Sequence, residues 1–588
     1  MWGTVMLGKK KISSLFIIGI LFVVSILIRW VLAQLTATMS IYYDELLYWD
    51  ISNSLFYEGA TKIRGILSSN KEIIYPLILS LAHKVSPENA YSTMLMINAI
   101  VMSSVIFPVY FMSKQLLKDN KMAICISVVS ILVPEMFYTT RLLQENIYYP
   151  LMMWIFFLFS QTIGQKSSCI RIGIFTVLIT GMTYVKSIGL SLVTGLLFFF
   201  FICIFRERQM KKTIQYCGFI LEITAIYFCC KRFFDAVISN IWIQEGGDSV
   251  NQLSKEVLGS LLDIKGMIKY IYPCISYYVF IVLFFGVFVV LVPIAYYKYL
   301  DRKQQDLLIY LIGIGLSTLI VVCTLIIGAD GEIGEKITRI HLRYFFYLFI
   351  PFLVFFMGLY HKIKTEGLNK WMTLFAFIYI GCVFITVMFI KQGSTIDSVA
   401  ATSLHAFFMT DMRQKILKII LISGTLMGCW MMHKKHIQIL YVCVCIAMCL
   451  LFGHSTQKSY KVSYNEKVAL KTMNQDGEIL SDYFSNQDIT YSLDDILIIA
   501  MNKMSSGMME VYFEYPYRVC EMSDFMTNVM DKNGNLNFEN LDFYCMHSYK
   551  LDDYLNPKYI IVQGSLDFNN YMKIDIGLRN FNIYQYVK

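Results

Sequence analysis

The stretch that decides the fold is the apolar run SLFIIGILFVVSILIRWVLAQL at residues 14–35, together with the segment YYDELLYWD at residues 42–50. A helix needs about 20 apolar residues to cross the hydrocarbon core of a membrane. The second segment places two adjacent acids, Asp44 and Glu45, where such a helix meets water. Because acids are costly to desolvate there, the pair marks either a solvated loop or a working site.

Composition places the chain among polytopic membrane proteins. Of its 588 residues, 56% are hydrophobic and 16% are charged, whereas about a quarter of the residues of a soluble domain are charged. The net charge of +9 is therefore interpreted as a sign of membrane topology, and no nucleic-acid partner is expected. Most of the 15 cysteines lie in or beside apolar runs, although Cys520 and Cys545 could pair in an oxidising compartment.

Thirteen apolar runs are predicted to form membrane-spanning helices. They cover residues 13–35, 91–117, 121–140, 146–162, 169–184, 187–205, 213–230, 271–298, 306–328, 342–360, 371–390, 414–432 and 436–453. Lys and Arg concentrate in alternate connecting loops, and most acids of this region fall in the others. Since cytoplasmic loops carry the excess of Lys and Arg, we expect a multi-pass plasma-membrane protein with a cytoplasmic N-terminus and Asp44 outside.

Two domains are predicted. Residues 1–454 form the all-α polytopic transmembrane domain, with long outer loops at 36–90 and 231–270. A short apolar piece at 73–82 in the first of these loops is expected to lie along the interface as an amphipathic helix. Residues 455–588 are polar, with a turn signal at 531–534 and strand-like runs at 559–562 and 581–584. This second part is expected to be a small extracytoplasmic α/β domain.

The acids Asp44 and Glu45 are candidates for catalysis. A carboxylate at the boundary between membrane and water can act as a general base, with its pKa set by partial burial and nearby cations. Adjacent acids in an extended or turn segment point apart, so only one of the two is expected to reach the reactants. The alternative is an exposed acidic pair without a role.

The order and sidedness of several short motifs resemble those of the GT-C glycosyltransferases. The motifs are, in chain order, Tyr43-Asp44-Glu45-Leu46-Leu47-Tyr48, Arg64-Gly65, Tyr75-Pro76-Leu77, Gln144-Glu145-Asn146-Ile147-Tyr148-Tyr149-Pro150-Leu151, Tyr184-Val185-Lys186-Ser187 and Arg343-Tyr344. The pattern looks most like bacterial relatives of the protein O-mannosyltransferases and of the lipid A aminoarabinose transferases, which depend on polyprenyl-phosphate sugars. In layout, the resemblance extends over residues 13–453.

This resemblance implies a GT-C-like bundle that transfers a sugar from a polyprenyl phosphate to a glycan, protein or lipid acceptor at the outer membrane face. Asp44 would take the proton of the acceptor hydroxyl, with inversion at the anomeric carbon. Glu45 would support it, and Tyr43, Arg64 and Glu145 would orient the acceptor or the loop. No cofactor is required by the sequence, and a divalent metal, although possible, has no ligand set in it.

A lipid-phosphate donor also calls for cations near the outer face, because a departing phosphate must be neutralised in a low-dielectric site. Lys186 is the first candidate, since it lies at a short turn between two apolar runs where an unpaired charge is expensive. Three further candidates lie at outer helix ends, namely Arg141, Arg339 and Arg343. The alternative is that these cations snorkel or pair with acids, of which the nearest in sequence are Glu135, Glu145 and Glu332.

Three other ionisable residues stand apart from this pattern. Glu222 lies within the run 213–230 and is expected to face the interior of the bundle. His341 and His405 are expected to be neutral residues of the outer face, without visible partners. For Glu222, a structural hydrogen bond and a catalytic role are both open.

Two other functions stay open. A lipid-linked glycan polymerase or ligase would show a large outer loop rich in Arg and His late in the chain. The loop at residues 391–413 has only three basic or histidine residues, Lys391, His405 and Arg413. A transporter or flippase would show repeats and broken helices at the membrane midplane. In this chain the ionisable residues concentrate at one face, with Glu222 as the main exception.

Overall fold

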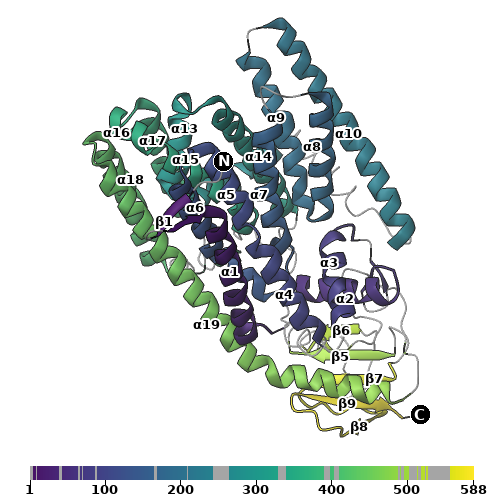
Figure 1. Cartoon of the computed structure of the whole chain (residues 1–588). Helices are drawn as coiled ribbons and strands as arrows, with labels where there is room; N and C mark the ends of the chain where they lie inside the picture. The colour runs from purple at the N-terminus through teal and green to yellow at the C-terminus, as the bar shows by residue number, and fades with distance from the viewer. Residues whose placement is uncertain are drawn as a thin grey trace.

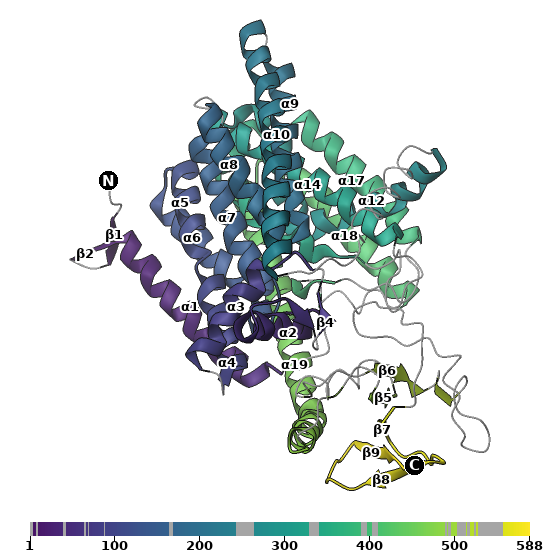
Figure 2. The same ribbon diagram turned by 90° about the vertical axis from the view of Figure 1, so that its right-hand side faces the viewer.

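The structure is a computed structural model with a helical bundle and a small sheet at one end (Figures 1 and 2). It describes residues 4–7, 10–38, 43–63, 66–68, 70–86, 89–163, 168–207, 209–242, 264–328, 340–389, 397–400, 402, 410–487, 491, 495–501, 513, 518–522, 525–526 and 557–587. A short hairpin of β1 (Thr4–Leu7) and β2 (Lys10–Ser13) precedes the first helix. The hairpin lies at the end of α1 that points away from the small sheet (Figure 1).

Within the described ranges, seven helices are long and apolar enough to cross a membrane, and up to ten if three bent pairs are each one span. The longest are α1 (Ser14–Thr36), α10 (Met210–Trp242), α14 (Arg302–Gly328), α18 (Asp411–His433) and α19 (Ile437–Ser485). All thirteen predicted runs coincide with helical segments. The prediction of an all-α polytopic membrane protein is therefore confirmed.

The other helices of the bundle are shorter. They are α4 (Ala90–Ser103), α5 (Ile106–Leu117), α6 (Asn120–Leu132), η2 (Pro134–Thr140), α7 (Glu145–Thr162), α8 (Cys169–Gly181), η3 (Met182–Tyr184), η4 (Ser187–Gly189), α9 (Leu190–Arg206), α12 (Ile264–Phe285), α13 (Val287–Ala295), η5 (Tyr297–Tyr299), η6 (Leu342–Tyr344), η7 (Phe346–Leu348), α15 (Phe349–Gly358), α16 (Tyr360–Glu366) and α17 (Lys370–Phe389). The sharpest break, 101°, separates α12 from α13. Gly286 lies at this break with a φ of +87°, a conformation that L side chains rarely adopt.

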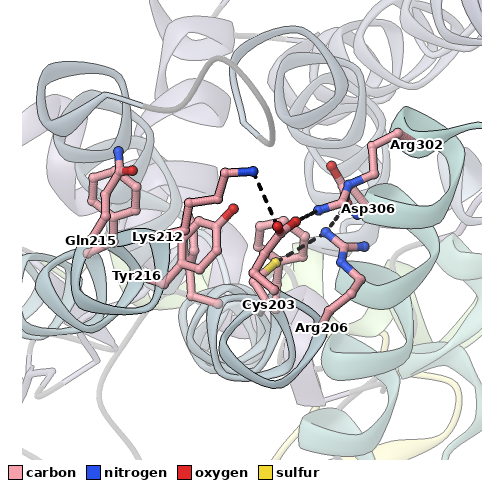
Figure 3. Close-up of a pocket in the computed structure, with 11 residues that line it drawn as sticks. Cys203, Arg206, Lys212, Gln215, Tyr216, Arg302 and Asp306 are labelled. Atoms are coloured by element: carbon pink, nitrogen blue, oxygen red, sulfur yellow. Dashed lines mark hydrogen bonds and ion pairs between the residues drawn. The ribbon is translucent and has the colours of Figure 1, made fainter. Parts of the chain in front are cut away.

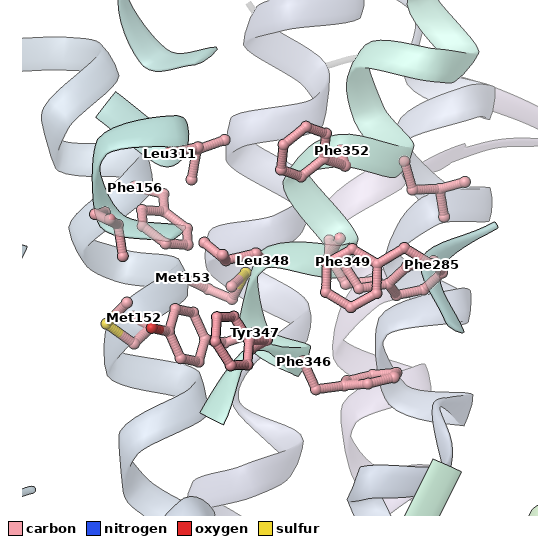
Figure 4. Close-up of a cluster of buried hydrophobic side chains, with 14 of the residues drawn as sticks. Met152, Met153, Phe156, Phe285, Leu311, Phe346, Tyr347, Leu348, Phe349 and Phe352 are labelled. Atoms are coloured by element: carbon pink, nitrogen blue, oxygen red, sulfur yellow. The ribbon is translucent and has the colours of Figure 1, made fainter. Parts of the chain in front are cut away.

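The core of the bundle is rich in aromatic side chains, of which α7, η7 and α15 supply many (Figure 4). Tyr148 and Tyr347 meet edge to face with ring centroids 5.6 Å apart, and the Tyr347 hydroxyl lies 3.1 Å from that of Thr318. Phe159 stacks on Tyr310 at 4.2 Å. Lipid tails are as apolar as these side chains, so close packing and buried hydrogen bonds hold such helices together.

One end of the bundle carries two short helices, α2 (Tyr43–Tyr57) and α3 (Ile74–Val85), and a hairpin of β3 (Lys62–Ile63) and β4 (Ile66–Leu67). The short helix predicted at residues 73–82 is α3. The extended or turn conformation expected around Asp44 and Glu45 is wrong, because both residues lie in the first turn of α2. Tyr48, Ile51 and Leu55 are buried at helical spacing, and α2 packs on α3.

At the same end, α19 leads into a five-stranded sheet (Figure 1). The strands are β5 (Ile496–Ala500), β6 (Arg518–Glu521), β7 (Tyr559–Gln563), β8 (Tyr571–Ile574) and β9 (Phe581–Tyr586), in the order β6-β5-β7-β9-β8. The strand pairs β5–β6 and β5–β7 are parallel, and β9 is antiparallel to β7 and β8. Two of the strands, β7 and β9, are those predicted at 559–562 and 581–584.

The helix α19 joins the bundle to this sheet. Leu480 and Phe484, near its end, pack on one face of the sheet, in one hydrophobic cluster with Ile498 of β5 and Ile561 of β7. The predicted domain boundary between residues 454 and 455 falls inside α19. The turn predicted at 531–534 and Cys545 lie outside the described residues.

Candidate active site

Three of the predicted site residues come together at the sheet end of the bundle. Glu145 begins α7, Lys186 lies between η3 and η4, and Arg343 is in η6. Lys186 Nζ lies 2.5 Å from Glu145 Oε1, and Arg343 Nε lies 3.7 Å from the same oxygen. The side chains of Lys186 and Glu145 are only 10% and 11% exposed. Two cations therefore share one buried carboxylate. The structure thus contains the ion pair with Glu145 that the sequence analysis gave as an alternative to phosphate binding.

A second carboxylate, Asp397, completes the cluster. Its Oδ2 lies 3.1 Å from Arg343 Nε and 3.1 Å from His341 Nδ1. The expectation that His341 has no partner is therefore wrong, because Asp397 approaches it from a segment 56 residues away. Tyr344 offers its ring to both cations, with Lys186 Nζ at 4.8 Å and Arg343 Cζ at 5.2 Å from the centroid.

The electrostatics of the cluster favour charged groups. Burial alone would favour the neutral acid, but Lys186 and Arg343 hold the pKa of the Glu145 carboxyl below its ordinary value. Glu145 is therefore a carboxylate at neutral pH, and the formal charges of Lys186, Arg343, Glu145 and Asp397 sum to zero. An anion that entered this site would have to share or replace the carboxylates.

Glu45 anchors helix α2 next to this cluster. It is fully buried, and its Oε1 accepts a hydrogen bond of 2.7 Å from the backbone N–H of Leu142, three residues before Glu145. Tyr75 of α3 lies nearby and donates to Asn98 at 3.1 Å. Burial raises the pKa of Tyr75, and the charges of Glu45 and Glu145 add to the rise. The supporting role predicted for Glu45 remains a prediction, and its contact is with the chain that leads into α7.

Glu72 is a residue that the sequence did not single out. Its two oxygens accept hydrogen bonds of 2.6 Å each, from the Gln144 amide and from the Ser187 backbone N–H. These two donors are the immediate neighbours of Glu145 and Lys186. Glu72 thus fixes the spacing between the two halves of the buried ion pair. No local sequence signal marks it, because its partners are 72 and 115 residues away.

The other predicted residues are placed differently or are not described. Arg141 pairs with Glu466 of α19 at 2.9 Å. Glu222 faces α8, where its Oε1 lies close to Gly173, and Glu135 accepts from Ser398 at 2.8 Å. Four of the predicted residues lie entirely outside the described part of the chain, namely Arg64, Arg339, Glu332 and His405. For Tyr43 and Asp44, the structure describes the backbone and not the side chain. Among the described residues, no group of three or more His, Cys, Asp or Glu could hold a metal ion.

Comparison with known proteins finds similarity at the level of structure. No protein-family model and no curated protein matches the chain. ArnT from Cupriavidus metallidurans, bound to undecaprenyl phosphate, shares 11% identity over 96% of this chain and 97% of its own, with a TM-score of 0.46. The archaeal oligosaccharyltransferase AglB from Archaeoglobus fulgidus, in complex with an inhibitory peptide and a dolichol-phosphate, shares 12% identity over 94% of this chain and 69% of its own, with a TM-score of 0.42. Both are members of the GT-C superfamily, which the motifs resemble. At such low identities and TM-scores, the likeness assigns neither a substrate nor an activity to this chain.

Proposed function

We propose that the chain is a glycosyltransferase that moves a sugar from a polyprenyl-phosphate donor to an acceptor hydroxyl at the outer face of the membrane. The observation that carries the proposal is the buried cluster of Lys186, Arg343, Glu145 and Asp397. It lies beside the helix that bears Asp44 and Glu45. Cations for a phosphate and a candidate base are thus supplied at the same end of a membrane bundle.

In the proposed reaction, the Asp44 carboxylate takes the proton of the acceptor hydroxyl. The acceptor oxygen forms a bond to the anomeric carbon, and the bond from that carbon to the phosphate oxygen breaks on the opposite side. The configuration of the sugar is inverted, and polyprenyl phosphate leaves as an anion. Glu45, through its hydrogen bond to Leu142, holds the start of α2 against the chain that precedes α7.

The two cations would stabilise the negative charge that develops on the leaving phosphate. Lys186 and Arg343 are both nearly buried, and donors in such a low-dielectric site stabilise an anion more than donors in water. Glu145 and Asp397 keep the two cations paired before the donor enters. The phosphate of the donor would then compete with these carboxylates for Lys186 and Arg343.

The test compares cell-envelope glycans and glycoproteins by mass spectrometry in cells that express the wild type, Asp44→Asn or Glu58→Gln. Glu58 is the matched control, because it is an exposed acid at the other end of α2, paired with Lys62. We expect the glycosylated product to be lost with Asp44→Asn and kept with Glu58→Gln at equal protein levels. Wild-type amounts of product with Asp44→Asn would overturn the assignment. Uptake of an unmodified substrate by sealed vesicles would instead indicate a transporter.

A further inference from the structure

A second polar site lies at the other end of the bundle, far from the cluster around Lys186. It is a pocket of about 370 Å³ between the end of α9 and the starts of α10 and α14 (Figure 3). Since α9 has 17 residues and a helix rises about 1.5 Å per residue, the two sites are about 25 Å apart along the bundle. The pocket therefore belongs to the opposite membrane boundary, which the charge pattern predicts to be cytoplasmic.

Cations exceed acids among the described residues that line the pocket. Arg206, Lys212 and Arg302 face the two carboxylates Glu207 and Asp306. Arg206 lies 2.6 Å from Asp306, whereas Arg302 and Lys212 both approach Glu207, at 2.5 and 3.2 Å. Although burial opposes it, Lys212 and Arg302 lower the pKa of Glu207, so this acid is charged. One positive charge remains uncompensated within the described lining.

Part of the hydrogen-bonding capacity of the arginines is left over in this pocket. In the described part of the structure, the buried Nε atom of Arg206 has no hydrogen-bond acceptor, and that of Arg302 faces Asp306 Oδ1 at 3.5 Å without a well-aligned hydrogen bond. Lys212 is half-exposed at the mouth and makes one ion pair. A guanidinium group is suited to bind phosphate oxygens with two parallel hydrogen bonds. The site thus has both the charge and the donors for one phosphate group.

The remaining wall of the pocket is aromatic. Phe200 is fully buried and lies 5.3 Å from Phe219 and 5.9 Å from Tyr216, measured between ring centroids. Their helices, α9 and α10, are membrane-spanning candidates, so the aromatic wall continues toward the hydrocarbon region. A ligand of this pocket therefore meets cations at one side and apolar rings at the other.

We propose that this pocket binds the phosphate headgroup of an anionic phospholipid from the adjacent leaflet. A basic pocket between membrane helices at a membrane boundary is the setting in which such headgroups are recognised. The phosphate would lie between Arg302, Lys212 and Arg206, and the glycerol and first acyl carbons would lie against Tyr216 and Phe219. This site is independent of the proposed transfer reaction.

The experiment titrates fluorescent phosphatidylglycerol into the detergent-solubilised full chain, with phosphatidylcholine and inorganic phosphate as competitors. We expect Lys212→Gln and Arg302→Gln each to weaken binding about fivefold, as expected for one cation near a membrane surface. Their matched controls, Lys211→Gln and Lys303→Gln, remove neighbouring exposed cations that do not line the pocket and should leave binding unchanged.

A further variant, Gln215→Trp, keeps every ion pair and places a large ring at the mouth of the pocket. It is expected to weaken lipid binding even if loss of Arg302 destabilises the helices, and thermal unfolding checks that each variant is folded. Equal affinities for the wild type, Lys212→Gln and Gln215→Trp would show that the cluster is only a structural ion-pair network. If inorganic phosphate competes as strongly as unlabelled phosphatidylglycerol, the pocket recognises a free phosphate, and the proposal of a lipid ligand is wrong.

Discussion

Lys186 shows how one buried charge can serve both folding and chemistry. Its ammonium group contacts the Glu145 carboxylate and the face of Tyr344, and it is almost out of contact with water. Removing one partner of such a pair leaves the other buried without compensation, which is costly, whereas removing both is often tolerated. The two roles can therefore be separated by mutating the residues singly and together.

Glu145→Leu is expected to lower the free energy of unfolding by about 3 kcal/mol, because it leaves Lys186 buried without a carboxylate. Lys186→Met is expected to cost less, because Arg343 still pairs with Glu145. The double variant should lose much less than the sum, because no buried charge of the pair remains. Denaturation of the purified single and double variants in detergent measures this difference. Additive losses would contradict a coupled pair.

The double variant Lys186→Met, Glu145→Leu also tests whether Lys186 takes part in the transfer reaction. If Lys186 binds the phosphate of the donor, the double variant will be folded but will form little glycosylated product, as measured by mass spectrometry of the cell envelope. Full product formation would contradict a phosphate contact, even though the pair stabilises the fold.

At the scale of elements, Glu72, which lies just before α3, connects two other parts of the site through its side chain. It holds the chain before α7 and the turn between η3 and η4 at a fixed separation through two short hydrogen bonds. In Glu72→Ala, the backbone N–H of Ser187 loses a charged acceptor. We expect amide hydrogen exchange in residues 186–189 to become at least about tenfold faster, equivalent to the loss of one charge-assisted hydrogen bond.

Hydrogen-exchange mass spectrometry of the full chain measures this change. Glu58→Ala is the matched control, because Glu58 is an exposed acid that, among the described residues, pairs only with Lys62 of β3. Unchanged exchange at Ser187 in Glu72→Ala would show that the turn is held by other contacts.

The elements themselves follow closely from the sequence, whereas the contacts between them do not. The spans α1, α9 and α14 are long apolar runs, so local composition is enough to predict them. Helix α2 was not predicted, because its segment mixes acids and aromatic residues without a clear apolar stripe. Lys186 could be predicted because a charge between two spans is expensive and because it lies in one of the motifs that resemble the GT-C family. Asp397 and Glu72 reach the site from distant segments that no local pattern connects to it.

On the scale of the whole molecule, the two ends of the bundle differ in their chemistry. One end carries α2, α3, the sheet and the buried cluster around Glu145. The other end carries the basic pocket around Arg302. The charge pattern of the loops predicts that the first end faces outside and the second faces the cytoplasm.

This orientation can be measured with epitope tags in sealed cells. A tag after Lys588, which follows the last strand, should bind antibody from outside. A tag inserted after Lys303, at the start of α14, should bind only after permeabilisation. The reverse result would invert the topology and would place the candidate active site in the cytoplasm.

The unbroken course of α19 has a mechanical consequence. Glu466 of this helix forms an ion pair with Arg141 beside the candidate active site. Asp476, about 15 Å further along, accepts hydrogen bonds from the backbone N–H groups of Arg579 and Asn580, which lie just before β9. α19 is one helical element between these two points, although its course bends between the bundle and the sheet (Figures 1 and 2). A movement of the sheet, for example on binding of an acceptor, therefore has a direct covalent path through this helix to the contact between Glu466 and Arg141.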